Sequence, residues 1–303
     1  MAAKMLISVI IPHLNQLTYL EKGLKALQAQ IGVRRDVQII VVDNGSRKLP
    51  EAICEAWPNV TLTTEPTPGP GPARNKGVKL AEGDLLAFID ADCTAAPNWL
   101  SAIETAFDDP DTQVIGGDVR VRYETPGKPT FLEPYESIYS YRNHEYIAKE
   151  GYSGTGNLAM RPDVHTIVGD FAGIDVAEDR DWGIRAKAHG ITTKFVTEMV
   201  IYHPARDSVG ELQQKWDRHI AHDFAQVETK GDAGKWLIKS FAMAASPLAE
   251  IPTVLTSDRV SGAKERWLAF LCLARVRLYR SQKMFSVLKS GAGKDISGAW
   301  NRR

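Results

Sequence analysis

The sequence predicts an α/β protein with a mostly parallel central sheet, flanked by helices, and a helical C-terminal extension. In the first third of the chain, short continuous apolar runs alternate with segments of helical periodicity. This alternation is typical of parallel strands that helices cover on both faces. Near the C-terminus, two apolar segments at 236–255 and 267–288 are interrupted by Pro247, Pro252 and Gly262, and we expect them to be helical.

Four apolar runs predict buried strands, because they are continuous and rich in β-branched residues. They lie at 6–12, 37–42, 60–64 and 84–89. Leucines at helical spacing between 17 and 27 predict a helix, as do 53–57 and 73–82. Ligands of parallel sheets bind beyond the carboxyl ends of the strands. Acidic and glycine-rich turns follow these strands, so we expect a nucleotide-type site at that edge.

The middle of the chain predicts a more mixed arrangement. Further strands are expected at 114–123 and 194–203, and a glycine-rich loop enters a strand within 151–161. Helices are expected at 131–149, 179–189 and 208–228.

We therefore expect two domains. The first covers residues 1–230, with a nucleotide-binding half at 1–92 and an acceptor-binding half at 93–230. The second is a basic, amphipathic, helical extension at 231–303.

Composition restricts the classes of protein that the chain can belong to. Its 303 residues are 44% hydrophobic and 24% charged, which excludes general disorder. Cys54, Cys93 and Cys272 have no spacing typical of zinc sites or disulfide frameworks, so a reducing compartment fits best. The apolar run near the N-terminus is too short for a signal peptide, and we expect no membrane-spanning helix.

Charge is distributed unevenly, although the net charge is zero. Residues 259–303 hold eleven Lys and Arg against Glu265 and Asp295, so the rest of the chain is acidic. A basic tail indicates contact with an anionic surface, which could be a membrane, a nucleic acid or the acidic part of the same chain. The tail has no interleaved aromatics on a basic sheet, so we expect no nucleic-acid binding.

The sharpest candidate site is Asp90-Ala91-Asp92, directly after a predicted strand. Two carboxylates at this spacing can reach a divalent cation and the diphosphate that it bridges. The alternative interpretation is a solvated turn, in which Asp is common. Asp43 also ends a predicted strand, where it could accept from a base N–H or form an Asx turn with Gly45 and Ser46.

Three other segments carry candidate polar groups. The loop Gly69–Asn75 opens a helix, so its free N–H groups and Arg74 could meet an anion, although it is not a P-loop. Glu178 and Asp179 begin another helix, where acidic residues can cap the helix or supply a general base. His203 follows a strand, and a lone histidine of this kind could equally be a packed core residue.

Taken together, these segments resemble the family-2 inverting glycosyltransferases, which have the GT-A fold. The resemblance covers roughly residues 5–220 and depends on the order of the motifs as well as their content. The matching segments are Ser8–Pro12 with Asn15, Val41–Ser46, Gly71–Gly77, Phe88–Asp92, Gly154–Arg161, Glu178–Arg185 and His203-Pro204.

The resemblance implies a role for each matching residue. Asp179 would be the general base, and Mn²⁺ or Mg²⁺ would bind Asp92 and His203. Asn157, Glu178 and Trp182 would contact the acceptor. The donor, a nucleotide sugar, would contact Pro12, Asn15, Asp43, Arg74, Asn75, Asp90, Ala91 and Asp92. Asp43 favours a pyrimidine base, so UDP or dTDP sugars are expected before GDP sugars.

The chain also departs from the family pattern. In the family an aromatic residue often precedes the Asn, and this chain has His13-Leu14 there. The contact that stacks on the nucleotide base is therefore expected to differ from that of the family. Residues 214–218 do not match the Q-x-x-R-W pattern of processive synthases, which favours transfer of a single sugar. A sugar-1-phosphate nucleotidyltransferase would need a basic Gly-rich loop after the first strand, where this chain has Pro12–Gln16. A catalytically silent sugar-nucleotide or membrane scaffold is the other alternative.

The C-terminal segment 267–288 predicts an amphipathic helix whose apolar face includes Trp267, Leu271 and Leu278. Its flanking Arg residues and its Trp are typical of helices that lie on a membrane. Such a helix would bring the enzyme to a lipid-linked acceptor at the inner face of the membrane, and we expect a cytoplasmic protein there. The alternatives are a helix docked on the catalytic domain and a homodimer interface.

Overall fold

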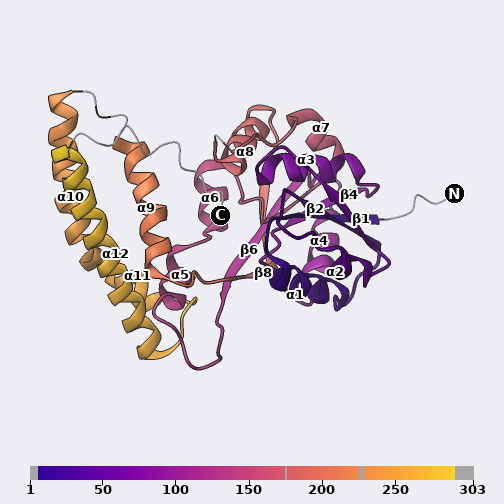
Figure 1. Cartoon of the computed structure of the whole chain (residues 1–303), viewed down its shortest axis with the longest axis horizontal. Helices are drawn as coiled ribbons and strands as arrows, with labels where there is room; N and C mark the ends of the chain where they lie inside the picture. Colours follow the sequence, from indigo (N-terminus) through magenta and orange to yellow (C-terminus); the bar gives the residue numbers. More distant parts are fainter. Residues whose placement is uncertain (1–5, 175, 225–226, 228, 291–303) are drawn as a thin grey trace. The chain divides into compact units, whose positions relative to one another are not determined.

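The apolar runs near the N-terminus form the parallel half of an eight-stranded sheet in the computed structural model (Figure 1), which describes residues 6–174, 176–224, 227 and 229–290. Strands β1 (Leu6–His13), β2 (Asp36–Asp43), β3 (Val60–Thr64) and β4 (Leu85–Ile89) lie in the order β3-β2-β1-β4, and every adjacent pair is parallel. The four predicted strands are confirmed. Their carboxyl ends therefore meet at one edge.

The second half of the sheet is antiparallel where its pairing is resolved. β7 (Asn157–Met160) runs antiparallel to β4, and β6 (Val114–Arg122) runs antiparallel to β7. β8 (Thr193–Pro204) follows β6 in the sheet, and the two-residue β5 (Thr94–Ala95) pairs antiparallel with β8. The β5–β8 pair brings the end of β8 to the segment that follows β4.

Helices cover both faces of this sheet. The core on one face joins alternate residues of β1 and β2 to α1 (Leu17–Gln28), α2 (Glu51–Glu55) and α4 (Trp99–Phe107). On the other face, Ile10 and Phe88 share a core with α3 (Pro70–Leu80), α7 (Pro162–Val168) and α8 (Glu178–Ala188). Because successive side chains of β1 point to opposite faces and helices cover both faces, most residues of β1 are apolar, with Ser8 and His13 as buried polar exceptions.

The single helix predicted over 131–149 is wrong. The structure has two short helices, α5 (Glu133–Tyr139) and α6 (Asn143–Glu150), with Tyr141 between them at a φ of 53°. A left-handed backbone at a non-glycine residue is unfavourable and stops a right-handed helix. The break directs the Tyr141 ring onto His203, with ring centroids 4.5 Å apart. Residues 140–142, which separate the two helices, include no Pro or Gly that would predict the break.

The chain divides into two compact units. One comprises residues 1–120 and 141–203 and holds the sheet, and the other comprises 121–140 and 204–303. The second unit contains α5, α9 (Val209–Phe224), α10 (Lys230–Ala249), α11 (Ile251–Thr256) and α12 (Gly262–Ser290). This division differs from the boundary expected at residue 230, because Leu212 of α9, Tyr135 of α5 and Leu273 of α12 share one apolar core.

The C-terminal extension is helical in its described part, and its residues 291–303 lie outside the described residues. Thr229 caps α10, since its hydroxyl accepts from Asp232 N–H and the Asp232 carboxylate accepts from Thr229 N–H. Among the described helices, none combines the length and apolar character needed to cross a bilayer.

Candidate active site

The carboxyl ends of β1 and β2 hold a buried histidine–aspartate pair. Parallel register places His13 opposite Asp43, and His13 Nδ1 lies 2.9 Å from Asp43 Oδ2. The other oxygen of Asp43 accepts from the backbone N–H groups of Gly45 and Ser46. Burial alone would raise the pKa of Asp43, but the hydrogen bonds from Ser46, His13 and Gly45 together hold it below its usual value. The lowered pKa favours the ionised form of Asp43, and its side chain forms the Asx turn with Gly45 and Ser46 that was one of the two alternatives for this segment.

The loops after β1 and β2 are tied together beside this pair. Asn15 adopts a left-handed φ of 57°, its N–H donates to Ser46 Oγ, and its side chain accepts from Arg47 N–H. Asn44 donates to the carbonyls of Glu65 and Thr67 and accepts from the N–H of Gly69, the residue directly before α3. The edge is thus pre-organised across three consecutive loops.

Arg74 on α3 joins the Asp-Ala-Asp segment to the start of α8. Its Nη2 donates to Asp90 Oδ1 at 2.6 Å and its Nη1 donates to Glu178 Oε1 at 2.9 Å. The Arg74 side chain is only 3% exposed, whereas those of Asp90 and Glu178 are 38% and 18% exposed. The Nε of Arg74 is buried without a hydrogen-bond partner in the described residues. The two carboxylates neutralise the buried guanidinium and fix α8 against the end of β4.

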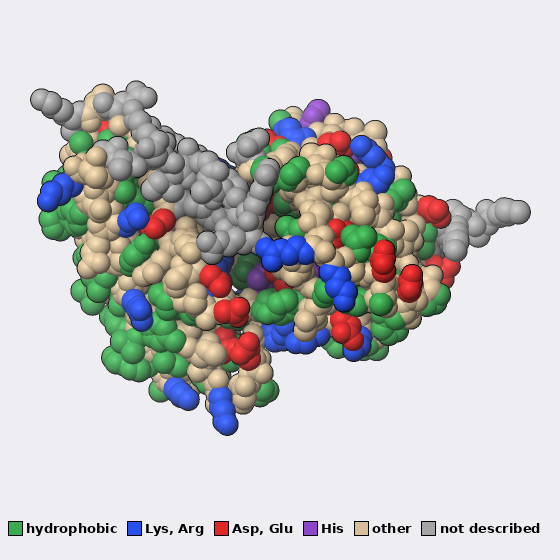
Figure 2. Space-filling view, viewed as in Figure 1, with side chains coloured by type: hydrophobic (Ala, Val, Ile, Leu, Met, Phe, Trp, Pro, Cys, Tyr) green, Lys and Arg blue, Asp and Glu red, His purple; other side chains and the backbone are tan. Residues whose placement is uncertain are grey.

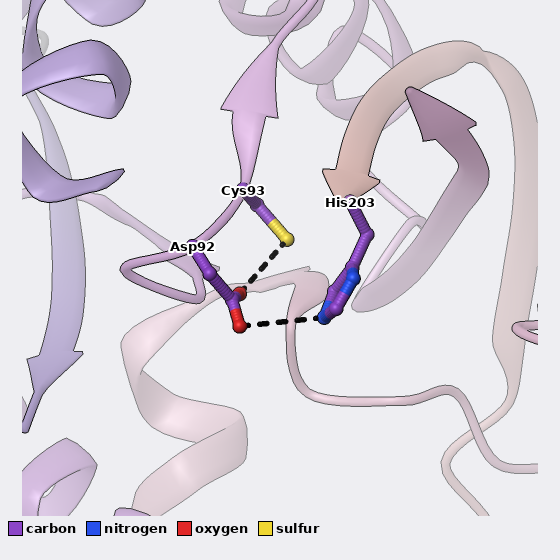
Figure 3. A group of neighbouring side chains, drawn as sticks. All are labelled: Asp92, Cys93 and His203. Carbon is purple, nitrogen blue, oxygen red and sulfur yellow. Dashed lines mark hydrogen bonds and ion pairs between the residues drawn. The ribbon is translucent and has the colours of Figure 1, made fainter. Parts of the chain in front are cut away.

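Asp92 and His203 meet where β5 begins and the antiparallel strand β8 ends (Figure 3). His203 Nε2 lies 3.4 Å from Asp92 Oδ2, and Cys93 Sγ lies 3.6 Å from Asp92 Oδ1. The ligand atoms of these three residues all lie within 4.8 Å of one another. The structure thus brings together the two residues that the sequence pairs as metal ligands.

Two residues that the sequence did not single out support this pair. Gln16 Nε2 donates to Asp92 Oδ2 at 3.1 Å. The Tyr141 hydroxyl lies 3.1 Å from His203 Nδ1, and its ring packs on the imidazole. Gln16 directly follows Asn15, which is predicted to bind the donor nucleotide, so its position in the sequence could have indicated a role in the site. No sequence feature indicated a role for Tyr141, because it lies inside a segment that is predicted to be helical.

The donor set fits a hard divalent cation. A carboxylate oxygen suits Mg²⁺ and Mn²⁺, an imidazole nitrogen is a common ligand of transition metals, and such sites usually keep positions for water and substrate phosphate. Asp92 and His203 are each 20% exposed, so both can reach a ligand from solvent. Cys93 is buried, and its thiol is a softer ligand than Mg²⁺ prefers.

Asp179 lies in the first turn of α8, one residue after Glu178. Its Oδ1 accepts from Arg180 N–H at 2.7 Å. Burial, and next the neighbouring charge of Glu178, raise the pKa of Asp179 above its usual value, against the opposing charge of Arg74. A partly buried carboxylate with a raised pKa has the properties of a general base.

The glycine-rich loop before β7, which includes Gly154 and Gly156, lies close to the carboxylates of Asp90 and Asp179. A methyl group added at Gly154 would lie 3.9 Å from Asp179 Oδ2, and one added at Gly156 would collide with the carboxylate of Asp90. Asp90 and Asp179 thus flank the same short loop. Glycine keeps the loop close to Asp90 without a side chain between them.

Other residues predicted for the site have internal roles in the structure. Asn157 is fully buried; it accepts from Trp99 Nε1 and donates to the carbonyls of Asp118 and Met199. Asn75 exchanges two hydrogen bonds with the backbone of Phe171, and Trp182 Nε1 donates to Gly169 O. Pro12 lies half-buried at the end of β1, opposite Val42 of β2, and Ala91 is buried.

The fold is an α/β sheet covered by helices with a polar site at its strand ends, and comparison with known proteins gives the family. The model of glycosyl transferase family 2 matches residues 8–180, which is more than half of the chain. The chain therefore belongs to glycosyl transferase family 2 and is a glycosyltransferase.

Curated relatives agree with this assignment. Glycosyltransferase AglE of Haloferax volcanii is 32% identical over 215 residues, which are 69% of this chain and 70% of that protein. The putative glycosyltransferase EpsH of Bacillus subtilis is 26% identical over 49% of this chain and 43% of its own length. The chain thus spans less than half of EpsH.

Solved structures confirm the GT-A fold. A mannosyltransferase from Pyrobaculum calidifontis, in complex with GDP-Man and Mn²⁺, matches with a TM-score of 0.59 at 16% identity, over 94% of this chain and 87% of that chain. Residues 1–349 of S. aureus TarS, in complex with UDP-GlcNAc, match with a TM-score of 0.53 at 18% identity, over 95% and 92%.

Proposed function

We propose that this glycosyltransferase transfers one sugar from a nucleotide-diphosphate sugar to an acceptor hydroxyl, with inversion at the anomeric carbon. The observation that carries the proposal is the placement of Asp92 with His203, 3.4 Å apart, and of Asp90 and Asp179 beside one glycine-rich loop. The first pair suits a diphosphate with its cation. Asp179 supplies a base on the acceptor side.

The donor nucleotide is proposed to bind at the ends of β1, β2 and β4. Asp43 lies buried at the carboxyl end of β2, where the family resemblance puts a carboxylate against the base. An N–H of a pyrimidine base can donate to that carboxylate, so we favour UDP or dTDP sugars. Asp90, held by Arg74, is assigned to the ribose. Because the structurally similar mannosyltransferase from Pyrobaculum calidifontis is in complex with GDP-Man, GDP is included in the test.

We propose that Mn²⁺ or Mg²⁺ binds Asp92 and His203. When bound there, the cation neutralises the charge that develops on the departing nucleoside diphosphate. Gln16 and Tyr141 then hold the two ligating side chains in position through the contacts described above. Arg74 keeps Asp90 oriented through its hydrogen bond to Asp90 Oδ1.

Asp179 is proposed to accept the proton of the attacking hydroxyl. The acceptor oxygen then bonds to the anomeric carbon, while the bond from that carbon to the diphosphate oxygen breaks. Attack from the face opposite the leaving group inverts the configuration. Glu178 raises the basicity of Asp179 and is itself oriented by Arg74. We assign Asn157 and Trp182 to the support of the acceptor wall, since both are buried.

Calorimetry tests the donor half of the proposal. UDP, dTDP, GDP and CDP are titrated into the full chain with and without Mn²⁺, and we expect metal-dependent binding of UDP or dTDP. Asp92→Ala should abolish the metal dependence, and the control Asp111→Ala, which changes an exposed carboxylate outside the site, should not. If no nucleotide binds under any condition, the proposal fails, and a catalytically silent scaffold becomes the better description.

The acceptor is proposed to be a glycan or a lipid-linked sugar, reached at the cytoplasmic face of a membrane through the C-terminal extension. The exposed apolar side chains of α10 and α12 support this membrane contact. A homodimer through the same helices is the competing arrangement. Transfer to a lipid-linked acceptor in vesicles, compared with transfer to the same glycan free in solution, distinguishes the acceptor classes.

A further inference from the structure

Helix α10 presents two apolar faces, of which its own unit covers one. Trp236, Ser240 and Met243 are buried against α9 and α12, at helical spacing along the inner side. On the opposite side Ile238, Phe241 and Leu248 are 71%, 63% and 69% exposed. Between 236 and 249 the sequence holds a single charged residue, Lys239. A helix that is apolar all round is normally buried on all sides, and the described residues of its own unit leave this outer side of α10 uncovered.

The neighbouring helices continue this surface. Leu255 of α11 and Trp267 of α12 are each 61% exposed, and Leu278 is 50% exposed. Phe241 of α10 packs edge to face on Phe285 of α12, so the two outer sides are continuous. We call this surface the outer face; its residues are Leu237, Ile238, Phe241, Leu248, Ile251, Leu255, Trp267, Leu271 and Leu278. Figure 2 shows the hydrophobic side chains gathered over these helices.

A cavity of about 330 Å³ lies within the outer face. It is lined by Ile251, Val254, Leu255, Ala263, Arg266, Trp267 and Phe270. The Arg266 guanidinium donates to the carbonyls of Val254 and Ser257, so its charge is used in fixing α11 to α12. The remaining lining is apolar, which suits a hydrocarbon chain and gives a polar ligand no partner.

Charge on these helices distinguishes between possible occupants. Lys264, Arg275 and Lys289 are exposed on α12, whereas Lys235 and Lys239 of α10 are exposed but pair with Asp232 at 3.7 Å and with Asp223 at 3.5 Å. Of the carboxylates on α10–α12 and their connections, Glu250 pairs with Arg277 at 3.6 Å, Glu265 accepts from Ser261 N–H, and the exposed Asp258 lies 4.0 Å from Arg259. Two copies of the chain, meeting through this face, would bring like charges together. An anionic surface is attracted instead.

We propose that the outer face binds the surface of an anionic lipid bilayer, with its cavity accepting a lipid acyl chain. This inference rests on the proposed membrane contact and names the helices, the side chains and the lipid chemistry. Trp267, with an amphipathic ring, lies at the level of the headgroups, and the apolar side chains of α10 enter the acyl region. The basic side chains contact anionic headgroups, each adding a modest electrostatic attraction.

Vesicle sedimentation of the full chain tests the proposal. Wild type should bind vesicles of phosphatidylcholine with phosphatidylglycerol roughly tenfold more tightly than vesicles of phosphatidylcholine alone. The triple variant Ile238→Gln, Leu248→Gln, Trp267→Gln should lose at least about tenfold in affinity. The matched control is Ile31→Gln, Leu80→Gln, Ile167→Gln, which changes exposed apolar residues of the other unit and should bind like wild type.

A charge-reversal variant covers the case in which the triple variant fails to fold. Lys264→Glu with Arg275→Glu leaves the apolar side chains in place and should remove the preference for anionic vesicles. Wild-type affinity in both variants would overturn the proposal. The proposal would also be overturned if the wild-type protein bound neither kind of vesicle and formed a dimer, and if the triple variant were monomeric. Nucleotide calorimetry on the same variants should be unchanged, which separates this test from the test of the donor site.

Discussion

His203 Nε2 lies 3.4 Å from Asp92 Oδ2, although the two residues are contributed by the segment after β4 and by the end of β8. The pairing of Thr94 with Tyr202 in β5 and β8 fixes this approach, one residue away from His203 and two from Asp92. Secondary structure on both sides therefore positions the pair before any ligand is present, so little reorganisation is needed when a cation and a diphosphate bind.

Replacement of either member of the pair should weaken metal-dependent nucleotide binding. We expect Asp92→Ala and His203→Ala to lower the affinity for the nucleotide in Mn²⁺ by about a hundredfold, because each removes a ligand. Tyr141→Phe should lower it by about tenfold, since it removes only the hydroxyl beside His203. Calorimetry with and without Mn²⁺ measures both effects. An equal loss of metal-free binding in all three variants would show general damage instead of a metal site.

Asp179→Asn should separate chemistry from donor binding. The amide keeps the size of the side chain but cannot accept the hydroxyl proton, so kcat should fall by about 10²–10⁴. The affinity for the donor nucleotide should stay within about twofold. Asp181→Asn is the control from the same helix turn, because Asp181 pairs with Arg185 at 2.9 Å and is assigned no chemical role. Wild-type turnover in Asp179→Asn would remove Asp179 from the mechanism.

The pH dependence of transfer should report the environment of Asp179. Its raised pKa means that the carboxyl keeps its proton to a higher pH than an ordinary aspartate, so activity falls as the pH drops through that pKa. Burial and the charge of Glu178 are the two largest causes. Glu178→Gln removes a like charge, so the acid limb of kcat/KM should move to lower pH. A limb that stays in place or moves upward would contradict this assignment.

Much of the site could be predicted because it lies at strand ends. Continuous apolar runs define β1, β2 and β4, and the residues after them must meet at one edge, which places Asp43, Asp90 and Asp92. Burial is harder to foresee. Asn157 and Asn75 belong to recognisable motifs, yet their side-chain amides donate to backbone carbonyls inside the protein. Local sequence does not reveal whether an amide will bond to the backbone or to a ligand.

The contribution of Tyr141 was beyond prediction for a related reason. Its left-handed backbone is imposed by packing against a residue that is distant in the sequence. The outer face on α10 was predicted only in part. The amphipathic pattern of 267–288 was visible, but the exposed side of α10 depends on which side its neighbours cover, and the structure alone supplies that.

Asn157→Ala should destabilise the unit that holds the sheet. The substitution removes three buried hydrogen bonds, one from Trp99 Nε1–H and one to each of the carbonyls of Asp118 and Met199. Removal of one partner of a buried hydrogen bond costs about 1–3 kcal/mol, so we expect a loss of about 3 kcal/mol or more. Thermal unfolding measures it as a lower Tm, by roughly 2–4 °C per kcal/mol for a domain of this size. The matched control is Asn98→Ala, at an exposed residue whose side chain donates to Glu198 O at 3.4 Å, and its Tm should stay close to that of wild type. Equal Tm values for the two variants would mean that Asn157 is not the internal support that its hydrogen bonds indicate.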